Sequence, residues 1–88
     1  MSRICFADEG WEDYLYWQAH DKKILKKINH LLKSIERDGI MEGEGKPEKL
    51  RYRIDTYSRR IDDANRLVYE VSDGMTIVKA CKGHYDDV

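Results

Sequence analysis

The sequence predicts a single α+β domain in which one strand and two N-terminal helices pack on an antiparallel sheet of four to five strands. Its 88 residues allow one hydrophobic core, so we expect one domain over residues 1–88. Apolar residues recur at helical spacing over residues 24–35, whereas short alternating segments separated by turn residues follow in the second half. The dipeptide Asp73-Gly74 between two apolar segments is typical of a two-residue β-hairpin.

The N-terminal elements are expected to be a strand and a helix. Residues 3–7 are apolar apart from the first and are typical of a short strand. Trp11, Tyr14 and Leu15 then recur at the spacing of one helical face, and the aromatic pair at 16–17 widens that face. This spacing predicts core packing on two sides rather than stacking on nucleic-acid bases.

The second helix is predicted more strongly. Asp21 is a suitable N-cap, because a carboxylate can accept hydrogen bonds from the first free backbone N–H groups of a helix, and Gly39 is a suitable end. The apolar stripe between them consists of Ile24, Leu25, Ile28, Leu31, Leu32 and Ile35. We therefore expect this stripe to lie in the core.

A loop and four strands are expected after the second helix. Residues 39–48 contain three glycines and the only proline, and a loop of this length in a small domain is more often functional than incidental. Residues 50–54 alternate apolar and basic side chains, which predicts a half-buried strand. Further strands are expected at residues 57–61, 66–71 and 75–82.

The hairpin turn also predicts a register. It places six residues on the core face of the last two strands: Leu67, Tyr69, Val71, Thr76, Val78 and Ala80. Arg66 then lies on the other face, roughly opposite Cys81 and a few residues from His84 and Tyr85. We therefore expect Arg66 and this His-Tyr pair to meet at one end of the sheet.

The composition excludes several classes of protein. With 41% hydrophobic and 38% charged residues, the chain is typical of a folded domain with a charged surface. No apolar segment is long enough to span a bilayer and the N-terminus lacks a signal-peptide pattern, so we expect a cytoplasmic location and no membrane contact. Cys5 and Cys81 are too few for a disulfide framework or zinc site and are expected to be buried thiols. No two histidines have helical metal-ligand spacing, and we predict neither metal nor cofactor.

The charge is unevenly distributed although the net charge is only −1. Residues 1–21 carry one basic and five acidic side chains, whereas residues 22–53 carry ten basic and five acidic ones. This asymmetry is compatible with a basic face that follows nucleic-acid phosphates. It is equally compatible with lysines that only solvate the second helix.

Five segments then carry a family resemblance: residues 11–17 (WEDYLYW), 45–48 (GKPE), 57–61 (YSRRI), 66–69 (RLVY) and 84–85 (HY). In this order, and over nearly the whole chain, they resemble the YoeB/Txe toxins of the RelE superfamily. The resemblance implies the fold of these toxins. It also implies a ribosome-dependent endoribonuclease that cuts messenger RNA in the A site, as the toxin of a type II toxin-antitoxin system.

The resemblance also implies roles for individual residues. The catalytic residues of the family match Glu48, Arg66, His84 and Tyr85. The basic residues expected along the RNA path are Lys46, Arg51, Arg59 and Arg60. Residues 86–88 extend past the tyrosine at which the family usually ends, and they add two carboxylates.

These side chains suit RNA cleavage without a metal, in which the 2′-hydroxyl attacks the adjacent phosphorus. Glu48 is the best candidate for the base, and His84 for the acid, because an imidazole with a pKa of about 6.5 is partly protonated near neutral pH. Arg66 would bind the phosphate through its planar fork of donors, and Tyr85 would stack on a base or bond the phosphate. Taken singly, Glu48 could be a solvated turn residue and Arg66 an ion-pair partner of Glu70.

Two other functions remain open, a non-cleaving module that binds the ribosome or RNA, and a corepressor acting with an antitoxin. The resemblance implies a cognate antitoxin of the YefM/Axe type, of the Phd/YefM class. It further implies contact with the ribosome and A-site messenger RNA, and with operator DNA only through the antitoxin complex. Some family members form homodimers, for which the apolar-rich first helix offers a surface.

Overall fold

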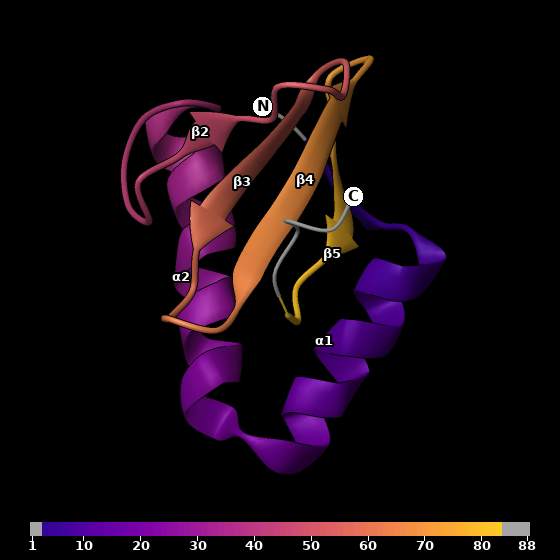
Figure 1. The fold of residues 1–88 in the computed structure, drawn as a ribbon, viewed down its shortest axis with the longest axis vertical. Helices are drawn as coiled ribbons and strands as arrows, with labels where there is room; N and C mark the ends of the chain where they lie inside the picture. Colours follow the sequence, from indigo (N-terminus) through magenta and orange to yellow (C-terminus); the bar gives the residue numbers. More distant parts are fainter. Residues whose placement is uncertain (1–2, 84–88) are drawn as a thin grey trace.

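The computed structural model describes residues 3–83, which form two helices and a five-stranded sheet (Figure 1). The elements are β1 (Arg3–Phe6), α1 (Asp8–His20), α2 (Lys22–Asp38), β2 (Glu48–Lys49), β3 (Thr56–Arg60), β4 (Arg66–Ser72) and β5 (Met75–Ala80). In the sheet the strands are ordered β1-β5-β4-β3-β2. The predicted α+β fold is confirmed, although β1 pairs parallel with β5, so the sheet is mixed.

Helix α2 begins and ends as its sequence predicts. The Asp21 carboxylate accepts hydrogen bonds from the backbone N–H groups of Lys23 and Ile24, at 3.0 and 3.2 Å. Gly39 ends the helix with φ of 112°, a value that residues with a side chain rarely adopt. The buried apolar residues of the stripe are Ile28, Leu31, Leu32 and Ile35, which pack in the core with β4 and β5.

Truncation of this stripe is expected to destabilise the domain. Leu31 is completely buried, so Leu31→Ala should lower the free energy of unfolding by about 2–5 kcal/mol through lost burial and a residual cavity. Urea denaturation measures this loss. The control is Ile54→Ala, at a side chain that is 85% exposed, which should change stability by less than about 0.5 kcal/mol. Equal stability of the two variants would contradict the assignment of the stripe to the core.

The β4–β5 hairpin has the predicted two-residue turn. Asp73 and Gly74 have φ of 50° and 76°, and Ser72 pairs with Met75. Two consecutive positive φ values are typical of a type I′ turn, whose twist matches that of the flanking strands.

A register shift further along this hairpin corrects one expectation. The shift lies between Val68 and Tyr69, so Val68 pairs with Ala80 and the alternation of β5 changes beyond it. Cys81, which is completely buried, therefore takes the core position expected for Ala80. The backbone N–H of Arg66 consequently meets the carbonyl of Gly83, at 3.0 Å, and not residue 81.

The expected strand at residues 50–54 is wrong. Strand β2 contains only two residues, and the chain then turns towards β3 through a loop. Leu50 is buried and its N–H donates to the carbonyl of Thr56 at 2.8 Å, which closes the loop. Tyr52 and Ile54 are 87% and 85% exposed, so the alternating pattern does not reflect a half-buried strand.

Helix α1 packs closely against β5. An added Cβ at Gly10 would lie 2.2 Å from the carbonyl oxygen of Val78, so only glycine permits this approach. Trp17 is buried, as expected, whereas Trp11 remains 45% exposed. Neither helix of the described chain is long and apolar enough to cross a membrane.

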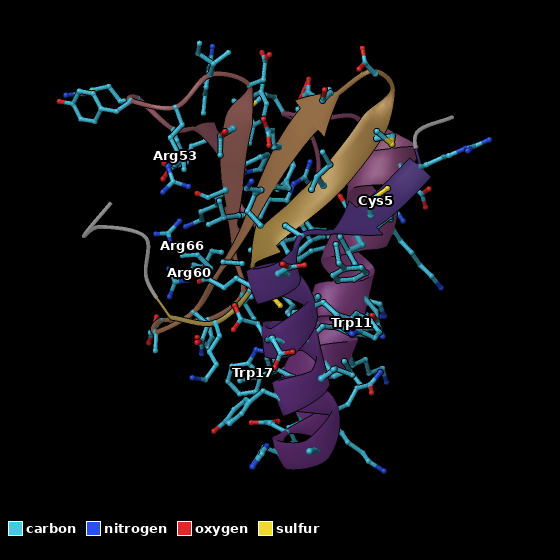
Figure 2. All side chains as sticks on the ribbon, turned by 90° about the vertical axis from the view of Figure 1, so that its right-hand side faces the viewer. Cys5, Trp11, Trp17, Arg53, Arg60 and Arg66 are labelled. Atoms are coloured by element: carbon cyan, nitrogen blue, oxygen red, sulfur yellow. The ribbon has the colours of Figure 1, made fainter. Side chains whose placement is uncertain are left out.

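The helices leave one side of the sheet uncovered within residues 3–83 (Figure 2). Strand alternation and register place the partly exposed side chains of Glu48, Arg60, Arg66 and Glu70 on that side, together with the buried Ser58 and Val68. We call the surface formed by Glu48, Arg60, Arg66 and Glu70 the open face.

Candidate active site

Glu48 and Arg66 meet on the open face although they lie on different strands. Glu48 pairs with Ser58, which in turn pairs with Val68, and Arg66 lies two residues before Val68 on the same face. Glu48 Oε1 lies 3.7 Å from Arg66 Nη1. The side chains are 53% and 23% exposed, so both can reach a ligand on this face.

This geometry bears on the alternatives that the sequence left open. Glu70 forms an ion pair with Lys79 at 3.6 Å, and among the described residues Arg66 forms one with Glu48 rather than with Glu70. Glu48 itself belongs to a paired strand rather than to a solvated turn. A carboxylate and a guanidinium are therefore held together on the open face, where both side chains are partly exposed.

Three of the four expected RNA-binding residues lie at the surface. Arg60 is opposite Arg66 in the β3–β4 register and forms an ion pair with Asp63. Lys46 and Arg51 are exposed in the segments on either side of β2.

The fourth, Arg59, is completely buried, and its expected role in RNA binding is corrected. Strand alternation points it away from Arg60, towards α2. Its Nε donates to the Tyr69 hydroxyl at 3.0 Å, and Nη1 donates to the Ser34 hydroxyl at 3.0 Å. The remaining acceptors are the carbonyls of Gly39, Ile40, Glu42 and Glu44, at 2.7 to 3.2 Å. All five N–H donors of this guanidinium are thereby used inside the protein.

Arg59 instead shapes the loop that leads to Glu48. Its acceptors lie at the end of α2 and in the following loop, where helix carbonyls otherwise lack donors. Burial raises the pKa of Tyr69, whose hydroxyl donates to the carbonyl of Ile40 at 2.6 Å. The backbone N–H of Arg60 donates to the carbonyl of Gly45 at 2.7 Å and ties the loop to β3. The position of Glu48 thus depends on a buried residue of the neighbouring strand.

Helix α1 and the β3–β4 turn hold the chain beyond β5. Trp17 Nε1 donates to the carbonyl of Cys81 at 2.8 Å, and Asp13 accepts from the N–H of Cys81 at 3.0 Å. Burial raises the pKa of the Cys81 thiol to about 12, as expected for a buried and unreactive thiol. The Asn65 side chain accepts a hydrogen bond from the N–H of Gly83 at 2.7 Å, and the carbonyl of Gly83 accepts one from the N–H of Arg66.

The predicted acid and its neighbour follow this anchored segment directly in the sequence. His84 and Tyr85 lie outside the described residues, as do residues 86–88. Their roles in the site therefore remain predictions. Within residues 3–83, the acidic, histidine and cysteine side chains form no group that could hold a metal ion.

Asn65 contributes to the site although its sequence context predicts no role for it. Its side chain and backbone N–H both donate to the Asp62 carboxylate, at 3.1 and 2.8 Å, while its amide oxygen holds Gly83. The sequence does contain an Asp followed three residues later by Asn, a pattern typical of a turn that side chains stabilise. The contact between Asn65 and Gly83 depends on the tertiary structure and could not be predicted from that signal.

Asn65→Ala is expected to lower the maximal rate of the reaction proposed below by about tenfold, because the lost hydrogen bond anchors the segment beside Arg66. A matched control is Asn29→Ala, which removes a hydrogen bond of the same 2.7 Å length from Tyr14, between the two helices. Asn65→Ala should lose the more stability of the two in urea denaturation, because it also removes the hydrogen bond to Asp62, so the two rates are compared under conditions in which both variants are fully folded. A rate loss of the same size in both would mean that Asn65 acts only on stability.

The comparison with protein families shows what kind of chain carries this site. The family model of the YoeB-like toxins of bacterial type II toxin-antitoxin systems matches residues 6–85. The chain belongs to this family. Its sequence is 46% identical to toxin YoeB of Escherichia coli K12 over 84 residues, which cover 94% of this chain and 99% of that protein.

Solved structures agree with this membership. The YoeB dimer from Staphylococcus aureus has a TM-score of 0.89 and 52% identity to this YoeB-family chain, covering 96% of it and 98% of that structure's chain. The YoeB–YefM complex from the same organism has a TM-score of 0.86 and 50% identity, with coverage of 97% and 99%. This YoeB-family chain is therefore the toxin of a type II toxin-antitoxin system.

Proposed function

We propose that this toxin is an endoribonuclease that cuts messenger RNA in the ribosomal A site. The observation that carries the proposal is the Glu48–Arg66 pair, held at 3.7 Å on the open face by three paired strands. The pair places a proton acceptor, the Glu48 carboxylate, beside a guanidinium that can bind a phosphate. Membership of the YoeB family supports the same reaction, and its model extends through His84 and Tyr85.

The proposed reaction requires only side chains. Glu48 accepts the proton of the 2′-hydroxyl, and the 2′-oxygen of the RNA forms a bond to phosphorus. The bond from phosphorus to the 5′-oxygen breaks, and that oxygen takes a proton from His84. The products are a 2′,3′-cyclic phosphate and a 5′-hydroxyl.

Arg66 supplies the positive charge that this reaction needs. In the free toxin its guanidinium pairs with Glu48, and a bound phosphate would replace that carboxylate. The exchange would leave Glu48 available for the 2′-hydroxyl. Arg66 would then stabilise the charge that develops on the phosphate oxygens, and Tyr85 would bond the phosphate or stack on a base.

The proposed partners are the ribosome, its A-site message and a cognate antitoxin. A chain of 88 residues with a net charge of −1 offers little surface for reading codons, so the ribosome would position the message. The S. aureus complex supports an antitoxin of the YefM type for this toxin, and the dimer structure supports self-association. Contact with operator DNA would occur only through the antitoxin.

Mapping messenger 5′ ends after incubation of the toxin with translating ribosomes tests the proposal. We expect new 5′ ends within the A-site codon that carry a 5′-hydroxyl, and upstream fragments that end in a cyclic phosphate. Stalled but uncut messages would contradict cleavage and favour a toxin that only binds. A 5′-phosphate on the new ends would contradict attack by the 2′-hydroxyl.

A further inference from the structure

The loop between β2 and β3 presents a basic and aromatic surface beside the proposed active site. We call residues 51–54 the β2–β3 loop surface. All four of its residues, Arg51, Tyr52, Arg53 and Ile54, are exposed. None of them lies in a strand, so their side chains serve neither the core nor a ladder of strand pairs.

Hydrogen bonds hold both ends of this loop. Leu50 donates to the carbonyl of Thr56 at 2.8 Å, and the Thr56 hydroxyl donates to the carbonyl of Ile54 at 2.9 Å. The N–H of Val71, on β4, donates to the carbonyl of Asp55 at 2.9 Å. The loop is therefore attached to β3 and β4, two of the three strands that position the Glu48–Arg66 pair.

The two arginines of the loop differ from the other arginines near the site in that they are exposed and form no ion pair with another described residue. Arg60 and Arg66 are ion-paired with carboxylates, and Arg59 is buried. Among the described residues, neither Arg51 nor Arg53 takes part in an ion pair. Their guanidinium groups therefore keep their charge available for a phosphate.

Figure 2 shows Arg53, Arg66 and Arg60 in succession along the same side of the sheet, away from the helices. They come from the β2–β3 loop surface, from β4 and from β3. A strand of RNA bound at Arg66 would therefore meet a further guanidinium on the side of the loop. Extended RNA carries one phosphate per nucleotide, so successive guanidinium groups match its charge.

We propose that the β2–β3 loop surface binds the messenger RNA strand next to the cleaved bond, with Arg53 on a phosphate and Tyr52 against a base. The proposal rests on the proposed function, because it places the same strand along the open face. Tyr52 is 87% exposed between two arginines, an arrangement that suits single-stranded RNA, whose bases are free to stack on aromatic rings.

Fluorescence anisotropy tests the proposal with a labelled 2′-O-methyl RNA of about 12 nucleotides, which cannot be cut because it lacks a free 2′-hydroxyl. Arg53→Gln should weaken binding by about three- to tenfold, and the slope of log affinity against log salt should fall by about 0.7. Tyr52→Ala should weaken binding by about fivefold or more with an unchanged salt slope. Arg53→Lys should retain most of the salt slope.

The matched control is Arg3→Gln, which removes one exposed guanidinium that also has no ion pair among the described residues, from β1 at the opposite edge of the sheet, and should leave both quantities unchanged. Equal affinity and slope for Arg53→Gln and the original toxin would overturn the proposal. Unchanged RNA binding with weakened self-association in sedimentation would also overturn it, and would assign the surface to a protein contact.

A ribosome experiment separates this inference from the proposed function. In single-turnover cleavage on programmed ribosomes, Arg53→Gln should raise the toxin concentration needed for half-maximal rate and leave the maximal rate within about twofold. If the original toxin does not cut, the proposed function fails, while the anisotropy result still decides the role of Arg53. If it cuts and Arg53→Gln behaves identically at every salt concentration, the inference fails alone.

Discussion

Replacing Glu48 with glutamine is expected to lower the single-turnover rate of messenger cleavage by about two to four orders of magnitude. Glutamine has nearly the same shape, but its amide cannot accept the proton of the 2′-hydroxyl. The change also removes the negative partner of Arg66, which lies 3.7 Å away. Since the guanidinium remains, RNA binding should stay close to that of the original toxin while the maximal rate falls.

The control for this variant is Glu70→Gln. Glu70 lies on β4, faces the same side as Arg66 and forms an ion pair of 3.6 Å with Lys79. Partly exposed pairs of this kind contribute only about 0–1 kcal/mol, so both variants should remain folded. Glu70→Gln should cut at nearly the original rate. Full activity of Glu48→Gln would show that another group accepts the proton.

The largest effect on stability is expected from Arg59→Met, which should lower the free energy of unfolding by about 3–5 kcal/mol. Methionine fills part of the volume but donates no hydrogen bond. The Ser34 hydroxyl, the Tyr69 hydroxyl and four loop carbonyls would each lose the hydrogen bond that Arg59 donates to them. A domain of this size is stable by only about 4–13 kcal/mol, so this loss is a large part of the total and should lower the urea midpoint strongly.

Arg60→Met is the matched control, because it removes the same group from the next residue, whose side chain is 44% exposed. It should change the urea midpoint little. Arg59→Lys separates charge from geometry, since one ammonium group cannot reach acceptors on both sides of the guanidinium. A loss below about 1 kcal/mol for Arg59→Met would contradict the structural role assigned to the buried arginine.

Local patterns were sufficient for the parts of the fold that depend on neighbouring residues. The apolar stripe of α2, its Asp21 cap and the Asp73-Gly74 turn each involve interactions over a few residues, and each was predicted correctly. The motifs around Glu48 and Arg66 likewise indicate the family from residue order alone, without knowledge of how the strands pair. A paired β4–β5 hairpin follows from its turn, because the turn brings the two strands together.

The class of fold, the family and the two residues of the Glu48–Arg66 pair thus follow from sequence patterns. Tertiary packing alone distinguishes Arg59 from Arg60, because adjacent strand residues point to opposite faces and only packing decides which face is buried. Packing also takes residues 50–54 out of the sheet, since alternation makes a strand only where a partner strand is available. The register shift after Val68 and the contact of Asn65 with Gly83 join residues that are distant in sequence. Such contacts depend on how complete elements pack, and no local pattern encodes them.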